Sequence, residues 1–155
     1  MPLVAWEEMR VSIHGSLPHY PGPPPNTDAQ IIELINTRFP GEGGSADFFL
    51  LLTDFLPGWE IKKIPISRGN MEWAARSVFH EVLKDGGNLF FLIQRRQTPD
   101  PAPTGWDRSL LNHLGKVGAL LGIAILDYLI FARDGSSYSF DDAGEIPKIE
   151  VPNPF

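Results

Sequence analysis

The chain has 155 residues, of which 43% are hydrophobic and 21% are charged, as is typical of a single globular domain. Its net charge of −6 argues against generic nucleic-acid binding, which usually needs a basic surface. The absence of cysteine excludes disulfides, a thiolate zinc site and a cysteine nucleophile. No apolar run is long enough to cross a membrane and no secretory signal is visible, so we expect a cytoplasmic protein.

The first 26 residues are rich in proline, which forbids regular structure over much of their length. We expect residues 1–26 to form an extended arm, with a single strand between Trp6 and Leu17. A capping box at Thr27 and Gln30 then predicts a helix over residues 28–39, which Pro40 ends.

The centre of the chain alternates between strand and helix patterns. The apolar run 48–53 predicts a strand buried on both faces, and residues 59–67 predict a second strand. Asn70 is a good helix N-cap for the amphipathic segment that follows, and Gly86 and Gly87 end that segment. Residues 89–93 form the next predicted buried strand, and a polar loop follows at residues 94–103.

The last third of the chain predicts a helix, a strand and a hairpin. The helix covers residues 105–121 and the strand covers residues 125–131. Asp134-Gly135 is a strong hairpin signal that leads into residues 137–140, and residues 147–155 read as an irregular tail. This order of elements predicts an α/β layered domain with a mixed sheet over residues 27–146.

Short motifs between residues 68 and 140 resemble, in order and spacing, the body of the RadC-like JAB/MPN family. The motifs are Arg68-Gly69, Ser77-Val78-Phe79 with Glu81, Asp100-Pro101 with Pro103, Leu120-Leu121-Gly122-Ile123 with Leu126-Asp127, and Asp134-Gly135-Ser136-Ser137-Tyr138-Ser139-Phe140. The resemblance implies a JAB/MPN fold, similar to the layered sandwich of cytidine deaminases, with a mixed sheet and flanking helices. It also implies a zinc ion held by two histidines spaced H-x-H and by a later aspartate, with a nearby serine and an upstream glutamate as general base.

This chain departs from that pattern at the metal site. The histidine positions fall on Gln94 and Arg96, the serine position on Thr104 and the aspartate position on Asp107. Glutamine is a weak zinc ligand, and arginine is a permanent cation with no lone pair to donate. We therefore expect no bound zinc or other cofactor.

Two further positions of the family pattern also differ here. The upstream glutamate falls at or near Lys63, although Glu60 remains an alternative, and a histidine usual beside the later aspartate is replaced by Tyr128. The surviving Asp107 has a structural explanation as well, because Thr104-x-x-Asp107 is a capping box for the helix that follows.

The first hypothesis for function is an inactive JAB/MPN-like domain that binds another protein or an anion. Arg68, Arg95 and Arg96 are the candidate binding residues, since cationic side chains at a strand's carboxyl end can engage a carboxylate or a phosphate. The alternatives are a divergent metal-dependent hydrolase that uses Asp107, and a nucleic-acid-binding protein, which the net charge disfavours. We expect a protein partner or a second copy of the chain, and neither nucleic acid nor a membrane.

Overall fold

The computed structural model describes residues 31, 33, 47–55, 58–84 and 86–148. The arm predicted over residues 1–26 and residues 149–155 lie outside the described residues, as does most of the first predicted helix, of which Ile31 and Glu33 are helical. The other elements, in chain order, are β1 (Phe48–Phe55), β2 (Gly58–Ile64), α3 (Met71–Lys84), β3 (Leu89–Arg95), α4 (Gly105–Leu121), β4 (Ala124–Phe131) and β5 (Ser137–Ser139).

From residue 48 onward, the predicted strands and helices are confirmed, with shifts at their ends. The second strand was predicted to reach residue 67 but ends at Ile64, because Pro65 has no N–H group to donate to a sheet. Asn70 caps α3 as predicted: its side-chain oxygen accepts a hydrogen bond of 3.1 Å from the backbone N–H of Trp73. Gly86 follows α3 with φ of 72°, the left-handed conformation that glycine adopts without strain.

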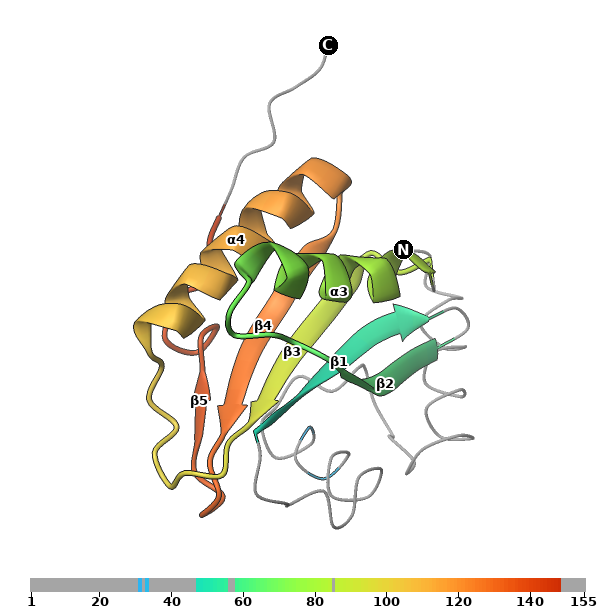
Figure 1. The fold of residues 1–155 in the computed structure, drawn as a ribbon. Coiled ribbons are helices and arrows are strands. Elements are labelled where there is room, and N and C mark those ends of the chain that lie inside the picture. The colour runs from blue at the N-terminus through green and yellow to red at the C-terminus, as the bar shows by residue number, and fades with distance from the viewer. Residues whose placement is uncertain (1–30, 32, 34–46, 56–57, 85, 149–155) are drawn as a thin grey trace.

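The five strands form one mixed sheet in the order β2-β1-β3-β4-β5. β1 pairs antiparallel with both β2 and β3, and β4 pairs antiparallel with β5. β3 and β4 are parallel, and α4 connects them. Figure 1 shows that α3 and α4 cover the same face of this sheet.

Each face of the sheet has its own hydrophobic core, because neighbouring residues of a strand point to opposite faces. On the face covered by α3 and α4, Phe49 and Leu51 of β1 pack with Phe79, Leu110 and the other apolar residues of these helices. On the opposite face, the buried cluster includes Leu50, Leu52 and Ile31. The prediction that β1 is buried on both faces is therefore confirmed.

The ends of α4 are fixed by local sequence. The Thr104 side chain accepts from the backbone N–H of Asp107, and the Asp107 side chain accepts in return from the backbone N–H of Thr104, which makes the predicted capping box. At the other end, Gly122 adopts the left-handed conformation with φ of 71°. Among the helices of the described residues, none has the length and apolarity needed to cross a membrane.

Candidate functional site: a buried polar cluster between β3 and α4

A cluster of polar side chains lies where the carboxyl end of β3 meets the first turn of α4. Gln94 belongs to β3 and pairs in register with Phe49, so it points to the face of the sheet that α4 covers. Arg96 follows the strand directly, and Asp107 lies in the first turn of α4. All three residues are buried, although each is polar or charged. A buried polar group must find partners within the protein, so their contacts define the site.

Asp107 is the acceptor at the centre of the cluster and is 0% exposed. Its Oδ2 atom accepts from the backbone N–H of Thr104 at 2.8 Å and from the Thr104 hydroxyl at 2.9 Å. Its Oδ1 atom accepts from Gln94 Nε2 at 2.9 Å and from the Tyr128 hydroxyl at 2.7 Å. Burial acts to raise the pKa of this carboxyl, but the hydrogen bonds from Thr104, Tyr128 and Gln94 lower the pKa below its usual value. Asp107 is therefore an anion whose oxygens are already occupied by donors.

Arg96 supplies the positive charge that balances this anion. Its side chain is 8% exposed, and its Nη2 group forms an ion pair and a hydrogen bond with Asp107 Oδ2. Its Nε group donates to Gln94 Oε1 at 2.7 Å, and its Nη1 group donates to the backbone carbonyls of Asp100 at 3.1 Å and Ala102 at 2.6 Å. The guanidinium thus faces the interior and fixes the loop between β3 and α4.

Gln94 and Tyr128 connect the two charged groups. The Gln94 amide accepts from Arg96 and from Arg68 Nη2 at 2.9 Å, and it donates to Asp107 and to the Tyr128 hydroxyl at 2.5 Å. Burial, followed by the nearby charge of Asp107, raises the pKa of Tyr128 well above its ordinary value. The hydroxyl therefore keeps its proton and donates a hydrogen bond to Asp107. Every member of this network has a hydrogen-bonding role that the chemistry of its side chain allows.

Arg68 is the part of the network that reaches solvent. Its side chain is 42% exposed, and its guanidinium lies over the ring of Trp106, 4.7 Å from the centroid. The Trp106 indole N–H donates to the backbone carbonyl of Arg68 at 3.1 Å. Asp47 Oδ2 lies 3.4 Å from Arg68 Nη2. A hollow of ≈ 960 Å³ opens beside Arg68, with Phe49, Trp73 and Asp47 among the residues that line it.

The structure brings together four of the five site positions given by the family resemblance: Gln94, Arg96, Thr104 and Asp107. It does not bring Lys63 to them. Lys63 pairs in register with Leu50 of the opposite core and lies 5.0 Å from the centroid of the Phe48 ring, so it belongs to the other face of the sheet.

Glu60, the alternative, lies four residues before Ile64 along β2, roughly 13 Å from the β2 position that is level with Phe49 and Gln94. It is therefore not part of the cluster either.

Asp47 is a residue of the site's rim that the sequence did not indicate. Besides its contact with Arg68, its Oδ1 atom accepts from the backbone N–H of Gln97 at 2.8 Å. Its position directly before β1 was the one feature of the sequence that could have indicated it. The register Phe48↔Arg95 sets the start of β1 beside the end of β3.

The three arginines proposed for anion binding lie in different environments. Arg96 is turned inward and its guanidinium is engaged with internal partners, whereas Arg68 is exposed. Arg95 belongs to the opposite face of the sheet, as its register with Phe48 shows, and its buried Nη1 atom has no hydrogen-bond partner among the described residues. Lys62 of β2 pairs with Glu81 of α3 at 2.9 Å. The three arginines and Lys62 therefore do not form one surface patch.

These features define a class: an α/β domain with a mixed five-stranded sheet, α3 and α4 on one face and a polar cluster at the carboxyl end of a central strand. The sequence pattern of the RadC-like JAB domain matches residues 59–145, which is more than half of the chain. The chain belongs to this family, and the mixed α/β sheet agrees with the JAB/MPN-like fold.

The chain is similar to several proteins that carry the name UPF0758 protein. The chain is 33% identical over 104 residues to the protein of Finegoldia magna, an alignment that covers 63% of this chain and 46% of the relative. It is 26% identical over 117 residues to the protein of Chlorobium chlorochromatii, covering 74% of this chain and 51% of the relative. It is 28% identical over 71 residues to the protein of Thermotoga maritima, covering 46% of this chain and 32% of the relative. The alignments thus span about half or less of the length of these relatives.

Proposed function

We propose that this chain is a non-catalytic RadC-like JAB domain that binds another protein through the surface beside the β3–α4 cluster. The observation that carries the proposal is the Arg96 guanidinium, which is paired with the carboxylate of Asp107 inside the cluster. Arg96 thus places a permanent positive charge beside Asp107, the one carboxylate that the family pattern assigns to zinc.

The donors of this cluster do not fit a zinc ion. Zinc prefers imidazole, thiolate and carboxylate ligands in a tetrahedral arrangement. Gln94 offers one neutral oxygen, which already accepts from Arg68 and Arg96. Both oxygens of Asp107 also accept hydrogen bonds, and Arg96 would repel a divalent cation. In the part of the chain that the structure describes, no three His, Cys, Asp or Glu residues form a group that could hold a metal.

The binding surface that we propose is the hollow beside Arg68. Phe49 and Trp73 give it apolar area, and Arg68 places a partly exposed cation at its inner edge. Because the Trp106 ring and Gln94 hold the Arg68 guanidinium in place, little side-chain entropy would be lost on binding. A partner segment with an acidic group flanked by apolar residues suits this arrangement.

The metal part of the proposal is tested by rebuilding the H-x-H pattern. Wild-type protein should contain no stoichiometric zinc and should not bind zinc in calorimetric titration. The double variant Gln94→His/Arg96→His should bind about one equivalent, because it places two imidazoles near Asp107. Adding Asp107→Ala to this double variant is the matched control and should abolish binding. Stoichiometric zinc in the wild type, removed by Asp107→Ala, would instead favour the divergent hydrolase.

The binding part is tested by affinity purification of the full chain from its native cells. A specific protein should be retained by the wild type and lost with Arg68→Glu. The control Lys116→Glu makes the same kind of charge change at an exposed position of α4 and should retain the partner. A partner retained equally by all three proteins would contradict the proposed surface. DNA binding with a steep salt dependence that Arg68→Glu removes would favour the nucleic-acid alternative.

A further inference from the structure

The outer face of α3 carries polar and apolar side chains in a symmetrical order. Trp73 is 58% exposed and Leu83 is 53% exposed, so this face of α3 presents apolar area as well as charge to solvent. Four exposed residues at spacings of four form what we call the α3 ridge: Glu72, Arg76, His80 and Lys84.

The positions of these residues are symmetrical about residue 78. The ridge begins with an acid at Glu72 and ends with a base at Lys84, each six residues from the centre. Trp73 and Leu83 lie five residues from the centre, and the periodicity of 3.6 residues per turn sets them on opposite sides of the ridge. A second α3 laid antiparallel on the first would therefore place Glu72 of each copy opposite Lys84 of the other. Rows of residues at spacing four are also the ridges by which helices commonly pack.

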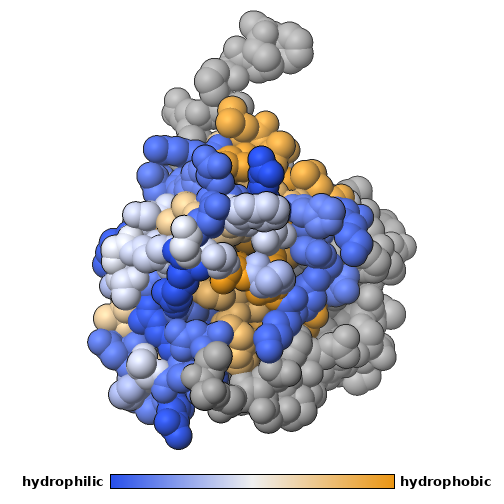
Figure 2. Space-filling model, viewed as in Figure 1, coloured by the Kyte–Doolittle hydropathy of each residue, from blue (hydrophilic) through white to orange (hydrophobic). Residues whose placement is uncertain are grey.

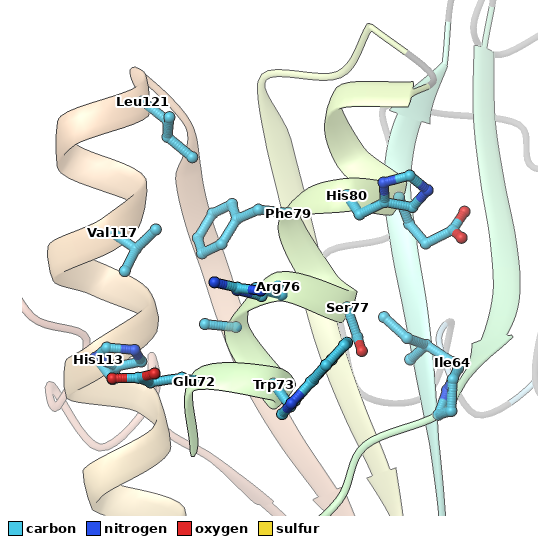
Figure 3. Close-up of a pocket in the computed structure, with 13 residues that line it drawn as sticks. Ile64, Glu72, Trp73, Arg76, Ser77, Phe79, His80, His113, Val117 and Leu121 are labelled. Carbon is cyan, nitrogen blue, oxygen red and sulfur yellow. The ribbon is translucent and has the colours of Figure 1, made fainter. Parts of the chain in front are cut away.

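The surroundings of the ridge leave space for such a partner. A hollow of ≈ 810 Å³ lies along α3, lined by Phe79 and Trp73 of that helix and by Val117 and Leu121 of α4. In Figure 3, Glu72, Arg76 and Phe79 point from α3 toward α4, while Val117 and Leu121 point back toward α3.

Apolar surface continues beyond this hollow toward the end of α4. Leu120 is 77% exposed and Leu121 is 46% exposed. Figure 2 shows the hydrophobic surface that gathers at the C-terminal end of α4. These residues extend the apolar area that a molecule docked on α3 would cover.

We propose that this face docks a second copy of the chain, with the α3 ridges of the two copies packed antiparallel about a twofold axis. In a twofold interface the same patch faces itself, so it must carry both charge signs in complementary places. The ridge meets this condition at Glu72 and Lys84, whereas a patch of one sign would repel its own copy. The proposal does not depend on the partner proposed for the Arg68 surface, although that surface adjoins this face and Trp73 lines both hollows.

A charge-swap experiment tests this pairing on the full chain by sedimentation velocity at low salt. Glu72→Lys and Lys84→Glu should each weaken self-association by about tenfold, because two attractive pairs of the dimer become repulsive. An equimolar mixture of the two single variants should recover wild-type affinity, since the new lysine of one variant then faces the new glutamate of the other. The two positions are about 18 Å apart along one helix, so this recovery cannot arise within one molecule.

Trp73→Ala should weaken the dimer by more than about a hundredfold, because the indole is removed from both copies. Asp142→Lys, an equal charge change in the exposed turn after β5, is the control and should leave the dimer unchanged. A wild-type protein that remains monomeric at its highest soluble concentration would overturn the proposal. A mixture of the two swap variants that associates no better than each variant alone would also overturn it.

Discussion

Arg96 and Asp107 form a buried ion pair in which each residue compensates the charge of the other. Removing water from either group is costly, and the cost is offset only if the pair and its hydrogen bonds are complete. Here Arg96 donates four hydrogen bonds, to Asp107, Gln94 and the carbonyls of Asp100 and Ala102. The loop between β3 and α4 is held by these bonds, so the pair contributes to the shape of the site as well as to its charge balance.

Arg96→Met should lower the free energy of unfolding by about 3 kcal/mol, because it leaves the Asp107 carboxylate buried without its counter-charge. Urea denaturation measures this loss. The double variant Arg96→Met/Asp107→Asn should recover part of it, since no unpaired charge then remains. Arg108→Ala breaks the exposed pair with Glu145 and serves as the control, with only a small effect expected. Equal effects of Arg96→Met and Arg108→Ala would show that the buried pair is not important for stability.

Asp127 is a second buried carboxyl, and here the effect of burial on the pKa outweighs that of the hydrogen bonds. Burial raises its pKa to about 6, although the Ser139 hydroxyl at 2.5 Å and the backbone N–H of Asp141 at 2.9 Å act to lower it. A carboxyl whose pKa is higher in the folded state than in the unfolded state binds protons preferentially when folded. Its contribution to stability is therefore fully present below about pH 4 and is lost as the pH rises through about 6.

Asp127→Asn should remove this dependence. Between pH 4 and pH 7 the free energy of unfolding of the wild type should fall, relative to that of the variant, by about 1–3 kcal/mol. Denaturant titrations of both proteins across this range measure the difference. Parallel pH profiles for the two proteins would contradict the raised pKa of Asp127.

At the scale of elements, α4 packs closely where its last turns approach β4. Gly118 lies in α4, and its carbonyl oxygen accepts from the backbone N–H of Ile123 at 2.9 Å. A Cβ atom at residue 118 would overlap the carbonyl oxygen of Ile123 and would lie 3.5 Å from the Phe79 ring of α3. Glycine is needed at this position because the backbone of the turn that follows α4 comes too near for a side chain.

Gly118→Ala should therefore destabilise the protein by about 2 kcal/mol, despite the higher helix propensity of alanine. Thermal and urea unfolding test this expectation. Gly105→Ala at the start of α4 is the matched control, because a Cβ there meets no heavy atom within 4 Å. The control should be neutral, and a neutral Gly118→Ala would show that α4 can move away from the turn.

At the scale of the whole molecule, the described residues are held by two hydrophobic cores on the two faces of one sheet. One core joins the sheet to α3 and α4, and the other contains Ile31 and the apolar residues of the opposite face. The polar cluster at the carboxyl end of β3 already contains a cation, the Arg96 guanidinium beside Asp107. We therefore expect the folded state to gain no stability from divalent metal.

Excess chelator, and separately excess zinc, should each leave the melting temperature of the wild type unchanged. The Gln94→His/Arg96→His variant is the positive control, for which zinc at 100 times its Kd should add about 2.7 kcal/mol of stability. Calorimetry of the same preparations gives the comparison. A fall in the wild-type melting temperature on chelation would contradict the proposed replacement of the metal.

The sequence by itself determined the elements, because the signals for them are local. The strand runs, the Asn70 and Thr104 caps and the glycines that end the helices each act within a few residues, and the structure confirms them. The family resemblance located four positions of the cluster, but residue identity could not show where Arg96 points.

Only the tertiary structure decided how these side chains meet. The register of β1 on β3 brings Asp47 within hydrogen-bonding distance of Gln97, 50 residues later. The register of β2 on β1 sets Lys63 on the opposite face. The parallel pairing of β3 and β4 brings Tyr128 to Gln94 and Asp107. Strand register depends on long-range packing, and a shift of one residue would turn every side chain to the other face. For this reason the inward-facing guanidinium of Arg96 could be identified only in the folded chain.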